Sequence, residues 1–101
     1  MDTRGAAGFI IDEEMFEVRF GPSRCFLGPG MEFRLIGALF DRKGRFVSLG
    51  YLIDRVWGGD DETGKNTIHR TVCNLRRKLR EAGITQVVIE AKVGYYRLLL
   101  P

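Results

Sequence analysis

The sequence lacks the apolar run of about 20 residues that a membrane-spanning helix requires, and its first residues lack the apolar core of a secretory signal peptide. Only two cysteines are present, Cys25 and Cys73. Two are too few for a disulfide framework and favour a reducing, cytoplasmic setting. A length of 101 residues holds one domain and excludes a large enzyme with its own cofactor fold. With 45% apolar and 29% charged residues, the chain is predicted to fold around one modest core.

Acidic residues are absent from residues 65–80, which contain six lysines and arginines. That segment carries a charge of +6, whereas the other 85 residues sum to −3, with ten basic against thirteen acidic side chains. A basic segment inside an acidic remainder predicts a face that binds a polyanion. The charge alone is equally consistent with a solvated helix face. The hydrophobic pattern of the segment is needed to distinguish that possibility from a polyanion-binding face.

Short strands are predicted near the N-terminus. Residues 16–20 alternate apolar and polar side chains, which is the period of a strand with one face on a core. Apolar runs precede them at 9–11 and follow at 24–27, so we expect a small antiparallel sheet. Residues 1–8 are expected to be disordered, and residues 9–101 to form the folded domain.

Three helices are predicted next. The first spans residues 31–42, and the second begins at Ser48, whose hydroxyl can cap the free N–H groups of the first turn. The third spans residues 66–81. Its aliphatic residues recur at intervals of four, three and four, which places them on one narrow seam. The seam consists of Ile68, Val72, Leu75 and Leu79.

The other side of the third helix carries residue types that read DNA. Opposite the seam lie Asn66, Arg70, Cys73, Asn74 and Arg77. In the major groove, arginine pairs bidentately with guanine and asparagine with adenine. Two later strands at 87–89 and 95–98, with a tip at 90–94, form a hairpin beside this helix. The expected fold class is α+β, a winged helix-turn-helix with an N-terminal antiparallel sheet, a three-helix core and a C-terminal β-hairpin wing.

Four segments, by their order and spacing, carry a family resemblance: MEFRLIGAL (31–39), FVSLGYLIDRVW (46–57), TIHRTVCNLRRKL (67–79) and VGYYRL (93–98). Together they resemble the C-terminal DNA-binding domain of OmpR/PhoB-type response regulators, over residues 9–98. The resemblance implies a four-stranded N-terminal sheet and a sequence-specific transcriptional regulator in the bacterial cytoplasm, associated with the nucleoid. It also implies binding to double-stranded DNA at promoter direct repeats, as a dimer or tandem pair, and contact with RNA polymerase through loop 58–65.

The resemblance also assigns roles to single residues. Base contacts fall on Arg70 and Asn74, and Arg77 on the same face is expected to join them. Contacts to the DNA backbone fall on Trp57, Asn66, Thr67, Thr71, Cys73, Arg76 and Tyr95. In the wing, Ala91 stands where the family often places a minor-groove arginine, and the neighbouring Lys92 is the nearest cation. The family commonly has Asp-Val-His where this chain has His69-Arg70-Thr71, so the target sequence is expected to differ.

Two residues of the third helix, His69 and Cys73, also have side chains that can bind metal or take part in catalysis. His69 and Cys73 lie four residues apart and offer two soft ligands, but a zinc site needs four ligands and a catalytic pair needs an orienting third group. No metal, cofactor, small-molecule substrate or enzymatic activity is therefore expected. A protein-binding adaptor stays open as an alternative: a winged fold that binds RNA polymerase or another regulator. The missing wing arginine and Asn74 favour that alternative.

The 101 residues include no receiver domain with a phosphorylatable aspartate. The chain is therefore expected to be either an excised domain or a free-standing regulator whose pairing does not depend on phosphorylation.

Overall fold

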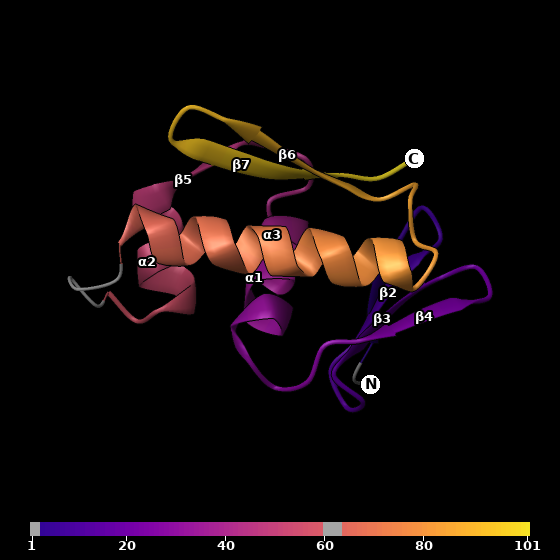
Figure 1. Cartoon of the computed structure of the whole chain (residues 1–101). Coiled ribbons are helices and arrows are strands. Elements are labelled where there is room, and N and C mark those ends of the chain that lie inside the picture. Colours follow the sequence, from indigo (N-terminus) through magenta and orange to yellow (C-terminus); the bar gives the residue numbers. More distant parts are fainter. Residues whose placement is uncertain (1–2, 60–63) are drawn as a thin grey trace.

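The computed structural model describes residues 3–59 and 64–101. Within them lie three helices, α1 (Met31–Asp41), α2 (Leu49–Val56) and α3 (Lys65–Glu81). The strands are β1 (Thr3–Ala6), β2 (Phe9–Asp12), β3 (Glu17–Phe20), β4 (Ser23–Phe26), β5 (Val47–Ser48), β6 (Val88–Lys92) and β7 (Tyr95–Leu99). α3 crosses the molecule, with the hairpin of β6 and β7 alongside it and the N-terminal strands near its end (Figure 1). The predicted α+β class is confirmed.

β1 to β4 form an antiparallel sheet in the order β1-β2-β3-β4. One face of this sheet packs on the core through Phe9, Ile11, Val18 and Cys25. Burial raises the pKa of the Cys25 thiol, which keeps this core sulfur uncharged. The three predicted strands correspond to β2, β3 and β4, and β1 completes the four-stranded sheet that the family resemblance implied.

The expected disorder of residues 1–8 is wrong for residues 3–8, which form β1 and a turn into β2. Ala7 and Gly8 both have positive φ angles, 52° and 84°. A two-residue hairpin turn of the type that matches strand twist requires this pair of angles. The segment Thr-Arg-Gly-Ala shows no alternation of apolar residues, so its pattern did not predict a strand.

Arg4 attaches β1 to the rest of the domain. Its Nε lies 2.9 Å from Glu13 Oε1, and its Nη1 pairs with the Asp41 carboxylate at the end of α1. The same guanidinium lies 5.7 Å from the centre of the Phe40 ring, a distance at which a cation is attracted to an aromatic face. β1 is therefore ordered by a contact with residues far along the chain.

β3 departs from the expected alternation at Glu17, which is only 6% exposed. The register places Glu17 opposite Asp12, so two carboxylates are neighbours on the outer face of the sheet. Arg19 Nη2 lies 3.4 Å from Asp12 Oδ2, and Arg24 Nη1 lies 3.8 Å from Glu17 Oε2. Two arginines thus balance the two acids.

α1 and α3 begin and end within one residue of their predicted bounds, and α2 begins one residue after the predicted Ser48. Ser48 Oγ accepts a hydrogen bond from the Tyr51 N–H at 3.1 Å, which is the predicted cap of α2. α1 gives way to a turn in which Lys43 and Gly44 have φ angles of 51° and 83°. The predicted seam of α3 is buried, and consists of Ile68, Val72, Leu75 and Leu79.

A second sheet, in the order β5-β7-β6, covers the C-terminal side of the core. β5 was not predicted, because two residues leave no periodic pattern to detect. The predicted wing tip at 90–94 is too long, since residues 90–92 belong to β6 and only Val93 and Gly94 turn the chain. Gly94 has a φ angle of 76°. The paired part of the wing is therefore longer than predicted.

Replacing Leu75 by alanine tests the packing of α3. Leu75 is fully buried, so Leu75→Ala is expected to lower the free energy of unfolding by about 2–5 kcal/mol through the cavity that it leaves. Arg80→Ala, at an exposed position of the same helix, is expected to change it by less than about 0.5 kcal/mol. Urea denaturation measures both, and equal stability of the two variants would contradict the packing.

Candidate nucleic-acid interface

α3 presents a basic, polar face to the solvent. Its exposed residues are Lys65, Asn66, Thr67, His69, Arg70, Cys73, Arg77 and Arg80, followed by one acid, Glu81, at the C-terminal end of the helix. Within the described part of the chain, no carboxylate lies within 4.0 Å of Arg70, Arg77 or Arg80. Lys78 differs, because its Nζ lies 2.5 Å from Glu32 Oε1 of α1. The guanidinium charges of the outer face are therefore left for an external anion.

The three residues predicted to contact bases share one stripe of α3. Arg70, Asn74 and Arg77 follow one another at intervals of four and three, so they lie on one side of the helix. Arg70 and Arg77 are exposed, and Asn74 is half-buried. This stripe lies opposite the buried seam, and the structure brings the three residues together as a surface row.

Two of the residues predicted to contact the DNA backbone, Thr71 and Arg76, use side-chain hydrogen-bond donors within the protein itself. Thr71 is 9% exposed, and its Oγ1 donates a hydrogen bond to the Thr67 carbonyl at 2.9 Å. Arg76 Nε and Nη2 donate to the Ile89 carbonyl at 3.1 and 2.5 Å. The Thr71 hydroxyl thus bonds its own helix and Arg76 joins α3 to β6, and the phosphate contacts expected of these two residues stay predictions.

Arg76 braces the wing against α3. β6 is an edge strand, since the sheet order β5-β7-β6 gives it only one strand neighbour. Ile89 lies in this strand and is buried, and a charged donor bonds a backbone carbonyl more strongly than a neutral one. The two hydrogen bonds from Arg76 therefore fix the orientation of the wing relative to α3.

The remaining predicted contacts on the helices differ in exposure. Asn66 and Thr67 are exposed in the first turn of α3, whereas Trp57 is half-buried at the end of α2 and packs on the core. Cys73 is exposed, and its Sγ lies 3.6 Å from His69 Nε2. In residues 3–59 and 64–101, no group of three or more His, Cys, Asp or Glu side chains is placed to hold a metal ion.

In the wing, the predicted contacts lie on the paired strands. Ala91 and Lys92 of β6 are exposed and stand opposite Tyr96 and Tyr95 of β7. Tyr95 is 47% exposed, whereas Tyr96 is buried. Burial raises the pKa of the Tyr96 phenol. Tyr95 is therefore the wing tyrosine that is open to a ligand, and Val93 at the turn is 95% exposed.

The wing also holds a cluster that the sequence pattern did not reveal. The Arg97 Cζ lies 4.4 Å from the centre of the Phe46 ring, and the Lys92 Nζ lies 5.7 Å from it. Arg97 Nη2 also lies 2.5 Å from Glu90 Oε1 on the neighbouring strand. Glu90 and Arg97 are opposite charges that face each other across the hairpin. Such a pair indicates a cross-strand contact only when the strand register is known, and the sequence does not provide the register.

A shallow cleft of about 260 Å³ joins the start of α3 to the wing. It is lined by Leu49, Lys65, Asn66, His69, Lys92, Gly94 and Tyr96. The Leu49 N–H donates to the Gly94 carbonyl at 3.2 Å, which ties the start of α2 to the wing turn. The first turn of α3 and the turn of the wing therefore form one continuous surface with two lysines, Lys65 and Lys92.

The sequence of the chain is similar to those of known transcriptional regulators. A family described as "Transcriptional regulatory protein, C terminal" matches residues 27–97. The phosphate regulon transcriptional regulatory protein PhoB of Rhizobium meliloti (strain 1021) is 33% identical over 82 residues, which cover 81% of this chain and 33% of that protein. The sensory transduction protein RegX3 of Mycolicibacterium smegmatis is 38% identical over 69 residues, or 66% of this chain and 30% of that protein. The chain spans about a third of the length of these relatives.

Solved structures share the fold. The DNA-binding domain of the response regulator AdeR, in complex with an intercistronic region, superposes with a TM-score of 0.77 at 24% identity and covers 97% of this chain and 100% of that one. The DNA-binding domain of CpxR from E. coli gives a TM-score of 0.76 at 24% identity, over 99% and 98% of the two chains. The predicted winged helix-turn-helix is confirmed. None of the described helices has both the length and the apolar character to cross a bilayer.

Replacing Arg76 tests the brace between α3 and β6. Arg76→Ala is expected to lower the free energy of unfolding by about 1–3 kcal/mol, because it leaves the Ile89 carbonyl without its charged donor. It is also expected to speed hydrogen exchange in β6. Arg77→Ala, at the neighbouring exposed position, is expected to change neither. Unchanged exchange in β6 of the Arg76 variant would show that the hydrogen bonds do not hold the wing.

Proposed function

The chain belongs to the family of transcriptional regulatory protein C-terminal domains, and we propose that it binds double-stranded DNA in a sequence-specific manner, with α3 in the major groove and the wing in the adjacent minor groove. The observation that carries this proposal is the stripe of Arg70, Asn74 and Arg77 on the outer face of α3. Its two guanidinium groups lack carboxylate partners among the described residues. The major groove is about 12 Å wide and admits an α-helix.

In this proposal the stripe reads bases. Arg70 and Arg77 donate to the O6 and N7 atoms of guanine, and Asn74 pairs with adenine, which are the pairings that base edges favour. Because Asn74 is half-buried, it reaches less far than the two arginines, and its base lies closest to the helix.

Backbone contacts surround this stripe. Lys65, Asn66 and Thr67 lie at the start of α3, Lys92 lies across the shallow cleft on the wing, and Tyr95 is exposed on the neighbouring strand β7. Phosphate contacts of this kind fix the register of a protein on the duplex and do not themselves read sequence. Arg76 contributes by holding the wing at one angle to α3, so the two sets of contacts meet the duplex together.

A pair of domains on direct repeats is the proposed arrangement on DNA. A single module of this kind has a small interface with DNA, so a second copy or a partner protein adds the affinity that one copy lacks. RNA polymerase is the proposed partner for loop 58–65, of which residues 60–63 lie outside the described residues.

Salt dependence separates DNA binding from the adaptor function. On a random duplex, where no specific site holds Arg70 and Arg77 against bases, the exposed cations Lys65, Arg70, Arg77, Arg80 and Lys92 are expected to neutralise about four phosphates, which gives a slope of about −4 in a plot of log K against log salt concentration. The binding of the chain to a random duplex, measured by fluorescence anisotropy at several salt concentrations, provides the slope. Absent or salt-independent binding would favour the adaptor.

Base readers and phosphate contacts respond differently to mutation. Arg70→Ala is expected to cost about 1–3 kcal/mol on the selected site and to relax the preference at one base pair, whereas Lys65→Ala is expected to weaken all duplexes alike and to reduce the salt slope by about 1. Arg34→Ala, an exposed cation of α1, serves as the remote control. Sites selected from random duplex pools give the preference, and equal losses on selected and random DNA for both α3 variants would refute these roles.

A further inference from the structure

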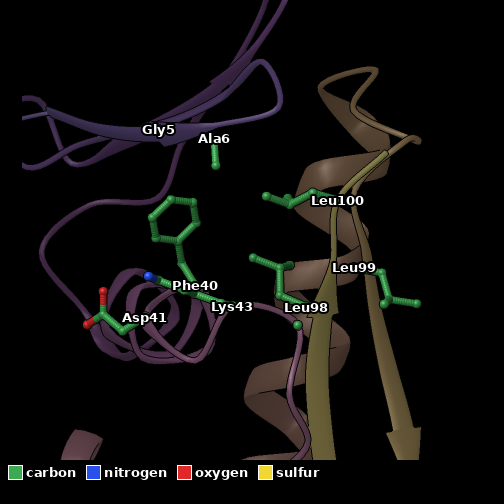
Figure 2. A pocket seen from close by; sticks show the side chains of 9 residues that line it. Gly5, Ala6, Phe40, Asp41, Lys43, Leu98, Leu99 and Leu100 are labelled. Carbon is green, nitrogen blue, oxygen red and sulfur yellow. The ribbon is translucent and has the colours of Figure 1, made fainter.

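A larger cleft of about 550 Å³ lies between the N-terminal sheet and the end of the C-terminal sheet. Figure 2 shows the Phe40 ring, the Ala6 methyl group and the side chains of Leu98 and Leu100 directed toward one another across it, while Leu99 points away. None of the residues that line this cleft belongs to α3 or to the turn of the wing. The cleft is therefore separate from the surface proposed to bind DNA.

The walls of the cleft are apolar. Phe40 and Leu100 are only partly buried, so part of their hydrophobic surface stays in contact with water inside the cleft. The short side chain of Ala6 leaves the space between them open. The cleft volume lies in the range of about 300–1,000 Å³ that small-molecule sites occupy, and removing this apolar surface from water favours binding of an aliphatic group.

The polar end of the cleft carries a positive charge. The Asp41 carboxylate is already paired with two arginines, Arg4 and Arg55, whose Nη2 lies 3.0 Å from Asp41 Oδ2. Lys43 is exposed and, among the described residues, has no carboxylate within 4.0 Å. Its backbone N–H donates to the Phe40 carbonyl at 3.1 Å, which fixes the residue beside the ring. The charge that remains for a ligand is the Lys43 ammonium.

We infer that this cleft binds an amphiphilic aliphatic carboxylate, of the type of a medium-chain fatty acid. The aliphatic chain lies between Phe40 and the two leucines Leu98 and Leu100, and the carboxylate pairs with Lys43. The apolar walls favour an aliphatic chain in the ligand, and the unpaired Lys43 ammonium favours a negatively charged head group. The inference does not depend on DNA binding, since the two surfaces share no residue.

Decanoate, below its micelle concentration, is the probe. Amide ¹H–¹⁵N NMR spectra of the unaltered chain are expected to show saturable shifts that centre on Gly5, Ala6 and Gly44, which line the cleft. Decyltrimethylammonium is expected to bind at least threefold more weakly because its head group is repelled by Lys43. Octanoate is expected to bind about twofold to fourfold more weakly for each methylene lost.

Two pairs of variants locate the site. Ala6→Phe fills the cleft and is expected to weaken decanoate binding at least tenfold, whereas Thr3→Phe, on the opposite face of the same strand, is expected to leave it unchanged. Lys43→Gln is expected to weaken it about threefold, and Arg45→Gln, an exposed cation outside the cleft lining, is the matched control.

The inference fails if decanoate shifts are spread over other surfaces, if the cationic amphiphile binds as well as decanoate, or if a folded Ala6→Phe protein binds normally. A dispersed spectrum establishes that each variant is folded. Should Ala6→Phe not fold, the comparison of head groups on the unaltered chain decides. The DNA salt slope is independent of all these outcomes, so failure here leaves the proposed function in place.

Discussion

Burial of the aliphatic seam of α3 is the interaction on which the rest of the structure depends. Ile68, Val72 and Leu75 are fully buried, and each such side chain contributes about 1.5–3 kcal/mol when removed from water. Exposed ion pairs contribute about 0–1 kcal/mol each, so the seam and not the charges sets the rotation of the helix. The spacing of four, three and four makes the seam narrow. All the cations that flank it are consequently left on outer or lateral faces.

The wing depends on a second, smaller constraint. A two-stranded hairpin is only marginally stable by itself, and the turn of Val93 and Gly94 gives it little support. Arg76 supplies the missing contact from α3 through two hydrogen bonds to the Ile89 carbonyl, and β5 pairs with β7 on the other side. The wing is therefore held between α3 and β5. Burial of the seam sets the orientation of α3, and Arg76 on that helix in turn sets the angle of the wing.

The sequence predicts what local patterns determine and misses what distant contacts determine. Helix bounds and the seam follow from periodicity and the Ser48 cap, which act within a few residues. The sequence did not predict β1, because this strand is held by a contact between Arg4 and Asp41, which are far apart along the chain. A contact of that kind leaves no pattern among neighbouring residues. For the same reason the sequence did not predict the hydrogen bonds of Thr71 and Arg76, to which the family resemblance assigned phosphate contacts. The Thr71 bond depends on its burial in α3 and the Arg76 bonds depend on Ile89 in β6. Arg70 and Arg77 were placed correctly on the outer face because the seam alone determines it.

β7 connects the two clefts, since its Tyr96 lines the shallow cleft at the start of α3 and its Leu98 and Leu99 line the apolar one. A ligand in the apolar cleft changes DNA affinity only if it distinguishes between two arrangements of this strand. β7 is paired on both sides, with β5 and β6, and Tyr96 and Leu98 anchor it in the core. Shifting the strand would break both ladders and expose these side chains together. Pairing and burial thus hold the strand between the two clefts in one arrangement, so we expect a ligand in one cleft to leave the other unchanged.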